Sequence, residues 1–366
     1  MKIEMLYVDA RISAHSLVRR FSRKLNLEPH ILSQSAELFQ ALNNENDPWR
    51  KGKQVLWLTR NKGAFLKSCP GTREYLCCGY RILHIGCYCT MDCAYCILQG
   101  YFHPPVLTYF INQEDMSDEL EDAFARKEIL RIGTGEFTDS LIWDMWSDLT
   151  PRLVERFGRQ NHAILELKTK TVAIDRLKGL KHNGKTIVAW SLNTPRMIES
   201  QEHGTASLKA RMRAAAQCQQ WGYRLAFHFD PLVIYPGCEE AYRQVLRTLF
   251  DHVSAEGIAW ISMGTMRFMP ELQSIIRRRF PQSDITYGEF IPGLDGKMRY
   301  FKPLRIRLYR SMVQWLRVHA PQVTVYLCME DETVWRKSFG FIPRSKGGLP
   351  AMLDEAACFT CDLQGD

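Results

Sequence analysis

Short apolar runs rich in β-branched residues alternate with longer amphipathic stretches along most of this chain, from about residue 80 onward. The runs at 81–85, 129–133, 164–168, 186–192, 224–229, 258–263 and 323–327 have the length and composition of buried strands. Apolar residues recur at helical spacing over 141–157, 207–221, 239–252 and 304–318. Strands that alternate with helices pair in parallel through right-handed crossovers, so the pattern predicts an open α/β sheet or an α/β barrel.

The N-terminal part of the chain has a pattern of its own. Two strands and two helices are predicted there, at 3–8, 54–58, 14–25 and 35–43. A turn sequence at 69–72 follows them. We therefore expect three parts: a small α/β domain over 1–78, a barrel over 79–345, and a C-terminal tail over 346–366 that carries Cys358-x2-Cys361.

The composition is that of a globular protein, with 46% hydrophobic and 24% charged residues, and it excludes a disordered chain. Every apolar run is interrupted before it reaches the ~18 residues that suggest a membrane span. The N-terminal sequence also lacks the apolar stretch of a secretory signal. We therefore expect a cytoplasmic protein with no membrane contact. In such a protein, the 12 cysteines indicate metal ligands or reactive thiols before disulfides.

Basic residues are concentrated in one segment, over 296–329. No Asp or Glu occurs between Asp295 and Glu330, whereas Lys and Arg are frequent there. Such a segment suits a polyanion, because Lys and Arg displace counterions from phosphates; a solvated helix face is the alternative. Basic and aromatic side chains beside a turn can enter a nucleic-acid duplex. The predicted nucleic-acid-binding residues are Arg299, Tyr300, Lys302 and Arg305.

The strongest local signal is the motif Cys89-x3-Cys93-x2-Cys96, directly after the first predicted barrel strand. Three thiolates on one loop can bind three irons of a [4Fe–4S] cluster and leave the fourth iron without a protein ligand. An open coordination position is where a cosubstrate binds. Structural zinc is the alternative, with Cys87 as an awkwardly close fourth ligand. A second metal is a further possibility for Cys69, Cys77, Cys78, Cys358 and Cys361.

The cysteine motif, with Tyr95 before its last cysteine, resembles the radical S-adenosylmethionine superfamily. Further motifs resemble the spore photoproduct lyase family, in order: Cys96-Ile97-Leu98-Gln99, Arg131-Ile132-Gly133, Thr138-Asp139-Ser140, Lys168-Thr169-Lys170, Ser191-Leu192-Asn193-Thr194 and Glu202-His203-Gly204-Thr205. The resemblance covers roughly residues 70–345. It implies a partial (β/α)6 barrel of the TIM type, a [4Fe–4S] cluster and S-adenosyl-L-methionine as cofactors. It also implies a carbon–carbon lyase that repairs damaged thymines in duplex DNA, and an electron donor such as flavodoxin or ferredoxin.

The resemblance also assigns roles to individual residues of this chain. It implies that Cys89, Cys93 and Cys96 bind the cluster. Residues expected to hold S-adenosylmethionine are Thr138, Lys170, Ser191, Asp230, Gly133 and Gly135. An ammonium such as that of Lys170 pairs with the methionyl carboxylate, and the two glycines allow the backbone to approach the ligand. Tyr95 and Glu136 are the predicted catalytic residues.

Two positions depart from the family pattern. Glu136 stands where the lyases carry the cysteine that returns a hydrogen atom to the product radical, and Ile97 stands where they carry a tyrosine. A carboxylate cannot donate a hydrogen atom at accessible energy, so we expect a different hydrogen source or a cofactor-binding role for Glu136. Two alternatives to the DNA-repair lyase stay open. One is a radical enzyme that modifies a peptide or small metabolite, and the other is a non-catalytic metal-cluster protein that binds nucleic acid.

Overall fold

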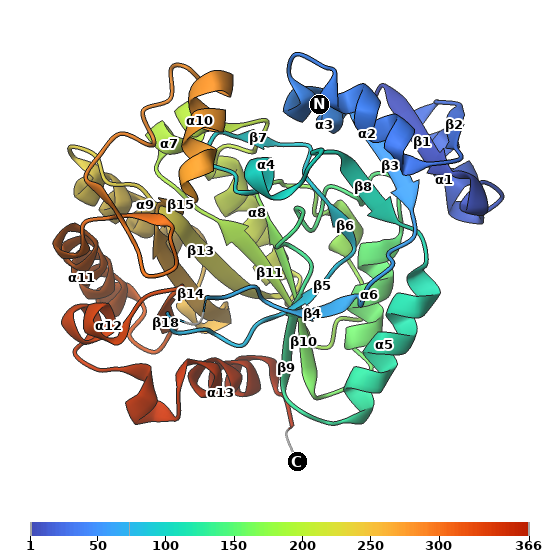
Figure 1. The fold of residues 1–366 in the computed structure, drawn as a ribbon. Coiled ribbons are helices and arrows are strands. Elements are labelled where there is room, and N and C mark those ends of the chain that lie inside the picture. The colour runs from blue at the N-terminus through green and yellow to red at the C-terminus, as the bar shows by residue number, and fades with distance from the viewer. Residues whose placement is uncertain (1, 73, 365–366) are drawn as a thin grey trace.

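The seven strands predicted from the alternating pattern form one curved sheet in the computed structural model, which describes residues 2–72 and 74–364 (Figure 1). The strand order is β18-β14-β13-β11-β10-β9-β5-β4, and all neighbours except β4 and β5 pair in parallel. The strands are β4 (Leu66–Ser68), β5 (Arg81–Leu83), β9 (Leu130–Gly133), β10 (Ala163–Thr169), β11 (Thr186–Ser191), β13 (Arg224–Leu232), β14 (Ile258–Thr265) and β18 (Thr324–Leu327). The predicted α/β fold, a partial TIM-type barrel, is confirmed.

Burial on both faces explains why these strands are continuous apolar runs. Every residue of β11 and of β14 is buried, as expected for a parallel sheet that is covered on both sides. Helices lie around the outside of the sheet (Figure 1). They are α5 (Gln113–Ala125), α6 (Leu149–Phe157), α8 (Leu208–Gln220), α9 (Cys238–His252), α11 (Lys302–His319), α12 (Glu332–Phe339) and α13 (Leu349–Cys361).

A second sheet carries the N-terminal part of the chain and lies beside the barrel, in the order β2-β1-β3-β8-β6 (Figure 1). Its strands are β1 (Met5–Asp9), β2 (Pro29–Leu32), β3 (Val55–Thr59), β6 (Gly86–Cys87) and β8 (Leu107–Phe110). Helices α1 (Ser16–Leu25), α2 (Ser35–Asn43) and α3 (Pro48–Gln54) complete it. The sheets do not divide at residue 78, because β4 joins the barrel sheet while β6 and β8 pair into the small one. The open edge of β3 takes β8 as its parallel partner, a pairing that hydrophobic patterning does not reveal.

Several helices differ from the prediction. Helix α6 begins at Leu149 rather than at residue 141, and turns precede it. The expected C-terminal tail contains α13, which packs against the barrel sheet with Leu349, Leu353 and Cys361 buried. In the described part of the chain, no helix is long and apolar enough to cross a membrane.

An insertion follows β14 and lies above one side of the barrel. It contains α10 (Pro270–Arg279) and a small antiparallel sheet of β15 (Arg267–Phe268), β16 (Phe290–Pro292) and β17 (Met298–Tyr300). Helix α10 packs against α4 (Leu98–Tyr101), which directly follows the cysteine motif. The insertion and the N-terminal sheet therefore approach the same loop from two sides (Figure 1).

Candidate functional site

The cysteine loop runs from β6 to α4 and is held against the barrel by a short ladder. Within it, β7 (Asp92–Cys93) pairs antiparallel with β12 (Glu202–His203), which follows α7 (Pro195–Gln201). The N–H of Ala94 donates to the carbonyl of Gln201 at 2.8 Å. These backbone bonds attach a loop near residue 90 to a segment more than a hundred residues later in the chain. The sequence motif alone did not indicate this attachment.

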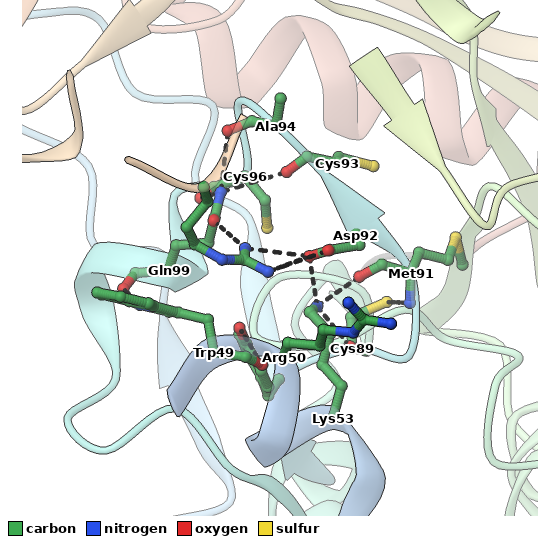
Figure 2. Close-up of polar contacts among 12 residues, drawn as sticks. Trp49, Arg50, Lys53, Cys89, Met91, Asp92, Cys93, Ala94, Cys96 and Gln99 are labelled. Atoms are coloured by element: carbon green, nitrogen blue, oxygen red, sulfur yellow. Dashed lines mark hydrogen bonds and ion pairs between the residues drawn. The ribbon is translucent and has the colours of Figure 1, made fainter. Parts of the chain in front are cut away.

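The buried side chain of Gln99 fills the inside of the loop. Its Nε2 donates to the carbonyls of Cys93, Ala94 and Cys96, at 3.2, 2.9 and 3.3 Å (Figure 2). Buried carbonyls need donors, and the backbone of the loop supplies only part of them: the Cys96 N–H donates to the Cys93 carbonyl and the Gln99 N–H to the Cys96 carbonyl. Gln99 therefore fixes the shape in which the loop presents its thiols.

The donor set of the loop fits an iron–sulfur cluster. Cys89 and Cys93 are buried and Cys96 is partly buried. Burial raises the pKa of Cys89 to about 12 and raises that of Cys93 well above its usual value, and the neighbouring thiols add to both shifts. Binding to a metal centre offsets this cost by stabilising the thiolates. Cys87, the fourth ligand considered for zinc, instead lies with its Sγ 3.3 Å from His84 Nε2.

No group of three or more His, Cys, Asp or Glu side chains in residues 2–72 and 74–364 is placed to hold a single metal ion. The cysteines considered for a second metal lie in two places. Cys69 and Cys77 interact electrostatically, whereas Cys361 lies beside Lys185, whose Nζ donates to the Cys361 carbonyl at 2.8 Å. Cys358 and Cys361 both lie on α13, where their thiols interact electrostatically with each other and with Asp354, Arg224 and Lys185.

Asp139 joins the ends of β9 and β10 at the mouth of the barrel. Its carboxylate accepts hydrogen bonds from the Thr169 hydroxyl at 2.9 Å and from the Lys170 N–H at 2.8 Å. Next to it, the buried hydroxyl of Thr138 has no hydrogen-bond partner within the described residues. An unpaired buried hydroxyl costs free energy, so Thr138 is suited to bind a polar ligand.

Lys170 and Tyr95 lie together beside the cysteine loop. The Nζ of Lys170 is 5.8 Å from the centre of the Tyr95 ring, and no carboxylate of residues 2–72 or 74–364 forms an ion pair with it, although its charge interacts electrostatically with Asp139. The Tyr95 hydroxyl donates to Glu202, which forms a buried ion pair with Arg211 at 2.6 Å. Burial raises the pKa of Tyr95, and the adjacent Glu202 raises it further, so the phenol stays protonated.

Glu136 forms an ion pair with Lys168, whose Nζ lies 3.3 Å from its carboxylate. Burial alone would lower the pKa of Lys168, but the carboxylates of Glu136, Glu166 and Asp230 outweigh it and raise this pKa above its usual value. Deeper in the barrel, Glu166 contacts His228 at 3.1 Å. Lys168 had no predicted role. Charged residues at every second position of the apolar strand β10 could have indicated it, since such residues share one face.

Comparison with known proteins identifies the family of this chain. The family model described as Spore photoproduct lyase matches residues 17–292. The chain belongs to the spore photoproduct lyase family. Spore photoproduct lyase of Bacillus subtilis (strain 168) is 24% identical over 326 residues, which are 87% of this chain and 92% of the relative. The enzyme of Clostridium acetobutylicum is 24% identical over 262 residues, 71% of this chain and 74% of the relative.

Solved structures share the fold. A mutant spore photoproduct lyase with bound AdoMet and dinucleoside spore photoproduct has a TM-score of 0.78 and 19% sequence identity, and the match covers 90% of this chain and 99% of that chain. The family resemblance seen in the sequence is therefore confirmed, together with the assignment to the radical S-adenosylmethionine enzymes.

Three of the residues predicted to bind the cofactor are in close contact with other residues of the protein. Asp230 accepts two hydrogen bonds from Arg267, at 3.0 and 2.9 Å. A Cβ at Gly133 would lie 1.6 Å from the Tyr80 hydroxyl, and one at Gly135 would lie 2.8 Å from the Cβ of Lys168. Both glycines are therefore closely packed against neighbouring residues, and their role in letting the backbone approach S-adenosylmethionine stays a prediction. Ser191 keeps its predicted place at the end of β11, where its carbonyl accepts from Arg211 at 2.8 Å.

The predicted nucleic-acid residues require a larger correction. Arg299 and Arg305 are buried and form ion pairs with Asp295 and Glu330. Asp295 and Glu330, which stand at the two ends of the acid-free segment, thus pair with cations that the charge pattern predicted to bind phosphates. Tyr300 is also buried, and its hydroxyl accepts from the N–H of Ile234 at 3.2 Å. Lys302 is partly exposed and pairs with Asp331 at 2.9 Å.

Apolar side chains are exposed around the turn that these cations hold. Leu294, at the turn between β16 and β17, is 71% exposed, and Phe301 is 45% exposed. Arg299 contacts Asp295 at 2.7 Å and stacks on Tyr75, with its guanidinium 4.0 Å from the ring centre. Arg299 therefore shapes the hairpin, and the hairpin presents Leu294 to solvent.

Proposed function

We propose that this protein is a radical S-adenosylmethionine lyase that repairs a thymine-dimer-type lesion in DNA. The observation that carries the proposal is the arrangement of three loop thiols beside Lys170, an ammonium that forms no ion pair in the described chain. Family membership supports the reaction class, because the curated relatives are spore photoproduct lyases.

Different residues of the site would bind the two cofactors. Cys89, Cys93 and Cys96 would bind a [4Fe–4S] cluster, and Lys170 would bind the methionyl carboxylate of S-adenosylmethionine. When bound and reduced by a donor such as flavodoxin or ferredoxin, the cluster supplies the electron that converts S-adenosylmethionine to methionine and a 5′-deoxyadenosyl radical. The unpaired Thr138 hydroxyl is a further hydrogen-bonding group for the same ligand.

Replacing Lys170 with Met should weaken S-adenosylmethionine binding by about tenfold or more, because a charged hydrogen bond contributes about 1.5–3 kcal/mol. Anaerobic equilibrium dialysis of the reconstituted protein measures the affinity, and iron analysis should show an unchanged cluster content. Lys168→Met is the matched control. Its ammonium is already paired with Glu136, so the loss of affinity should be smaller. Equal affinity in the Lys170 variant and the unaltered protein would contradict the assignment.

The end of the reaction must differ from that of the lyases with a cysteine at position 136. Glu136 is held by Lys168 and has no hydrogen atom to donate to a carbon radical. Cys69 and Cys328 are the thiols within electrostatic reach of Glu136. Burial, reinforced by Glu136, raises their pKa values to about 12 and about 11, so both keep the S–H that hydrogen donation requires. In the proposed site, the available thiols are therefore those of Cys69 and Cys328, which interact with Glu136, and none stands at position 136.

We expect slow conversion of spore photoproduct to thymine, with adducts of the external reductant, because no thiol stands at position 136. Glu136→Cys should raise the yield of thymine and reduce the adducts. Glu136→Ser is the control, because serine is similar in size to cysteine but has no thiol, and it should change neither product. Mass spectrometry of repaired DNA measures both products. S-adenosylmethionine affinity is measured in parallel, and a loss in both variants would make Glu136 a cofactor ligand. Rapid repair without adducts by the unaltered protein would contradict this account of Glu136.

Binding to duplex DNA should weaken steeply with salt, because each neutralised phosphate lowers log K by about 0.9 per tenfold rise in salt. Helix α11 carries exposed cations that can reach phosphates. Lys302 and Arg307 have side chains 43% and 74% exposed, and Arg310 is also exposed. Replacing these three residues with Glu should reduce both affinity and the salt slope, and should leave S-adenosylmethionine cleavage without DNA unchanged. Fluorescence anisotropy with a labelled duplex measures the binding.

The same titration separates the alternative substrates. DNA binding that is absent, or independent of salt, would favour a peptide or small metabolite as the substrate of the radical. Arg299 and Arg305 stay unchanged in this experiment, because charge reversal there would break buried ion pairs and disturb the fold.

A further inference from the structure

A buried lysine from the N-terminal part of the chain reaches into the cysteine loop. Lys53, on α3, has a side chain only 2% exposed. Its Nζ donates to the carbonyls of Cys89 and Met91, at 2.8 and 2.5 Å, and lies 3.6 Å from a carboxylate oxygen of Asp92 (Figure 2). The ammonium is also 4.1 Å from the centre of the Tyr88 ring. A buried charge is costly unless it is paired and hydrogen-bonded, and here these partners all belong to the cysteine loop, which begins at Tyr88.

Helix α3 is built to place this lysine. Asp47 caps the helix by accepting from the Arg50 N–H at 2.9 Å, and Pro48 begins it. Gly52 packs against the chain leading to β8, since a Cβ there would lie 1.6 Å from the Pro105 carbonyl oxygen. This close contact turns the next residue, Lys53, inward to the cysteine loop.

A second buried cation contacts the loop from the insertion that follows β14. Arg279, at the end of α10, has a side chain 3% exposed, and its NH2 lies 3.0 Å from Asp92 Oδ2. Its Nε also contacts Asp47 at 3.3 Å, and its NH1 donates to the side chain of Gln99. Asp92 is therefore paired with two buried cations that come from different parts of the fold.

We propose that Lys53 and Arg279 are positioning residues of the iron–sulfur site. These two residues help to retain the cluster and to set its reduction potential. This inference rests on the proposed function. The two side chains fix the carbonyls and the carboxylate of the cysteine loop, as outer partners do around other metal sites. Reduction adds one negative charge to the cluster. A buried ammonium hydrogen-bonded to the loop favours the reduced form, because charges interact strongly where water is excluded.

Lys53→Met removes the charge and keeps most of the side-chain length. We expect the reconstituted variant to lose iron to a chelator more readily, with metal retention weaker by about tenfold to 100-fold. We also expect its midpoint potential, measured by redox titration with electron paramagnetic resonance, to move to a more negative value. Lys51→Met is the matched control on the same helix. Lys51 pairs with Glu4 at 3.5 Å, away from the cysteine loop, so neither quantity should change.

Asp92→Asn tests the same inference with the opposite sign. It keeps the shape of the side chain and removes a negative charge, so the midpoint potential should move to a more positive value. If Lys53→Met does not fold, the Asp92→Asn variant still tests the inference. A role in folding alone would lower the yield of the variants without changing the potential of the cluster that they bind.

The outcomes distinguish this inference from the proposed function. Opposite shifts of potential in the two variants would support it. An unchanged potential in Asp92→Asn, or in a folded Lys53→Met, would overturn it while leaving the radical chemistry in place. Failure of the unaltered protein to bind a cluster would overturn the proposed function itself.

Discussion

The site depends on one constraint: a tight loop must hold three thiols, two of them buried, although its own backbone supplies only some of the donors that its carbonyl groups need. Side chains supply further donors. The Gln99 side chain donates to three carbonyls, and the ammonium of Lys53, on α3, donates to two more. The ladder with β12 joins the loop to the barrel. The small sheet, the barrel and the insertion after β14 are thus all needed to give the cysteine loop one shape.

The barrel supplies the second half of the site at the ends of its strands. Asp139 ties β9 to β10 and so places Thr138 and Lys170 beside the loop. Arg211 forms a buried pair with Glu202, which accepts the Tyr95 hydroxyl, so a helix outside the barrel stabilises the tyrosine of the cysteine motif. Two other cations of the barrel form ion pairs: Lys168 with Glu136 and Arg267 with Asp230. Lys170 differs from them, and this difference makes it the suited partner for a ligand carboxylate.

Much of this could be predicted from the sequence, and the reasons for the failures are physical. Strands such as β11 and β14 are apolar throughout because both of their faces are buried, so their pattern was sufficient. The cysteines were identified by their spacing. Lys53 and Arg279 were missed because their partners in the loop lie 36 and 187 residues away, and neither stands in a motif. Arg299 and Arg305 were misjudged because the charge pattern does not show that Asp295 and Glu330 turn inward.

The central claim is that the three loop thiols hold a [4Fe–4S] cluster that cleaves S-adenosylmethionine. The most direct measurement is anaerobic reconstitution with iron and zinc both offered, followed by metal analysis and an assay for 5′-deoxyadenosine after reduction. The account predicts about four irons per chain and formation of 5′-deoxyadenosine, both lost in Cys93→Ala. One zinc per chain without 5′-deoxyadenosine, or cleavage that persists in Cys93→Ala, would contradict it.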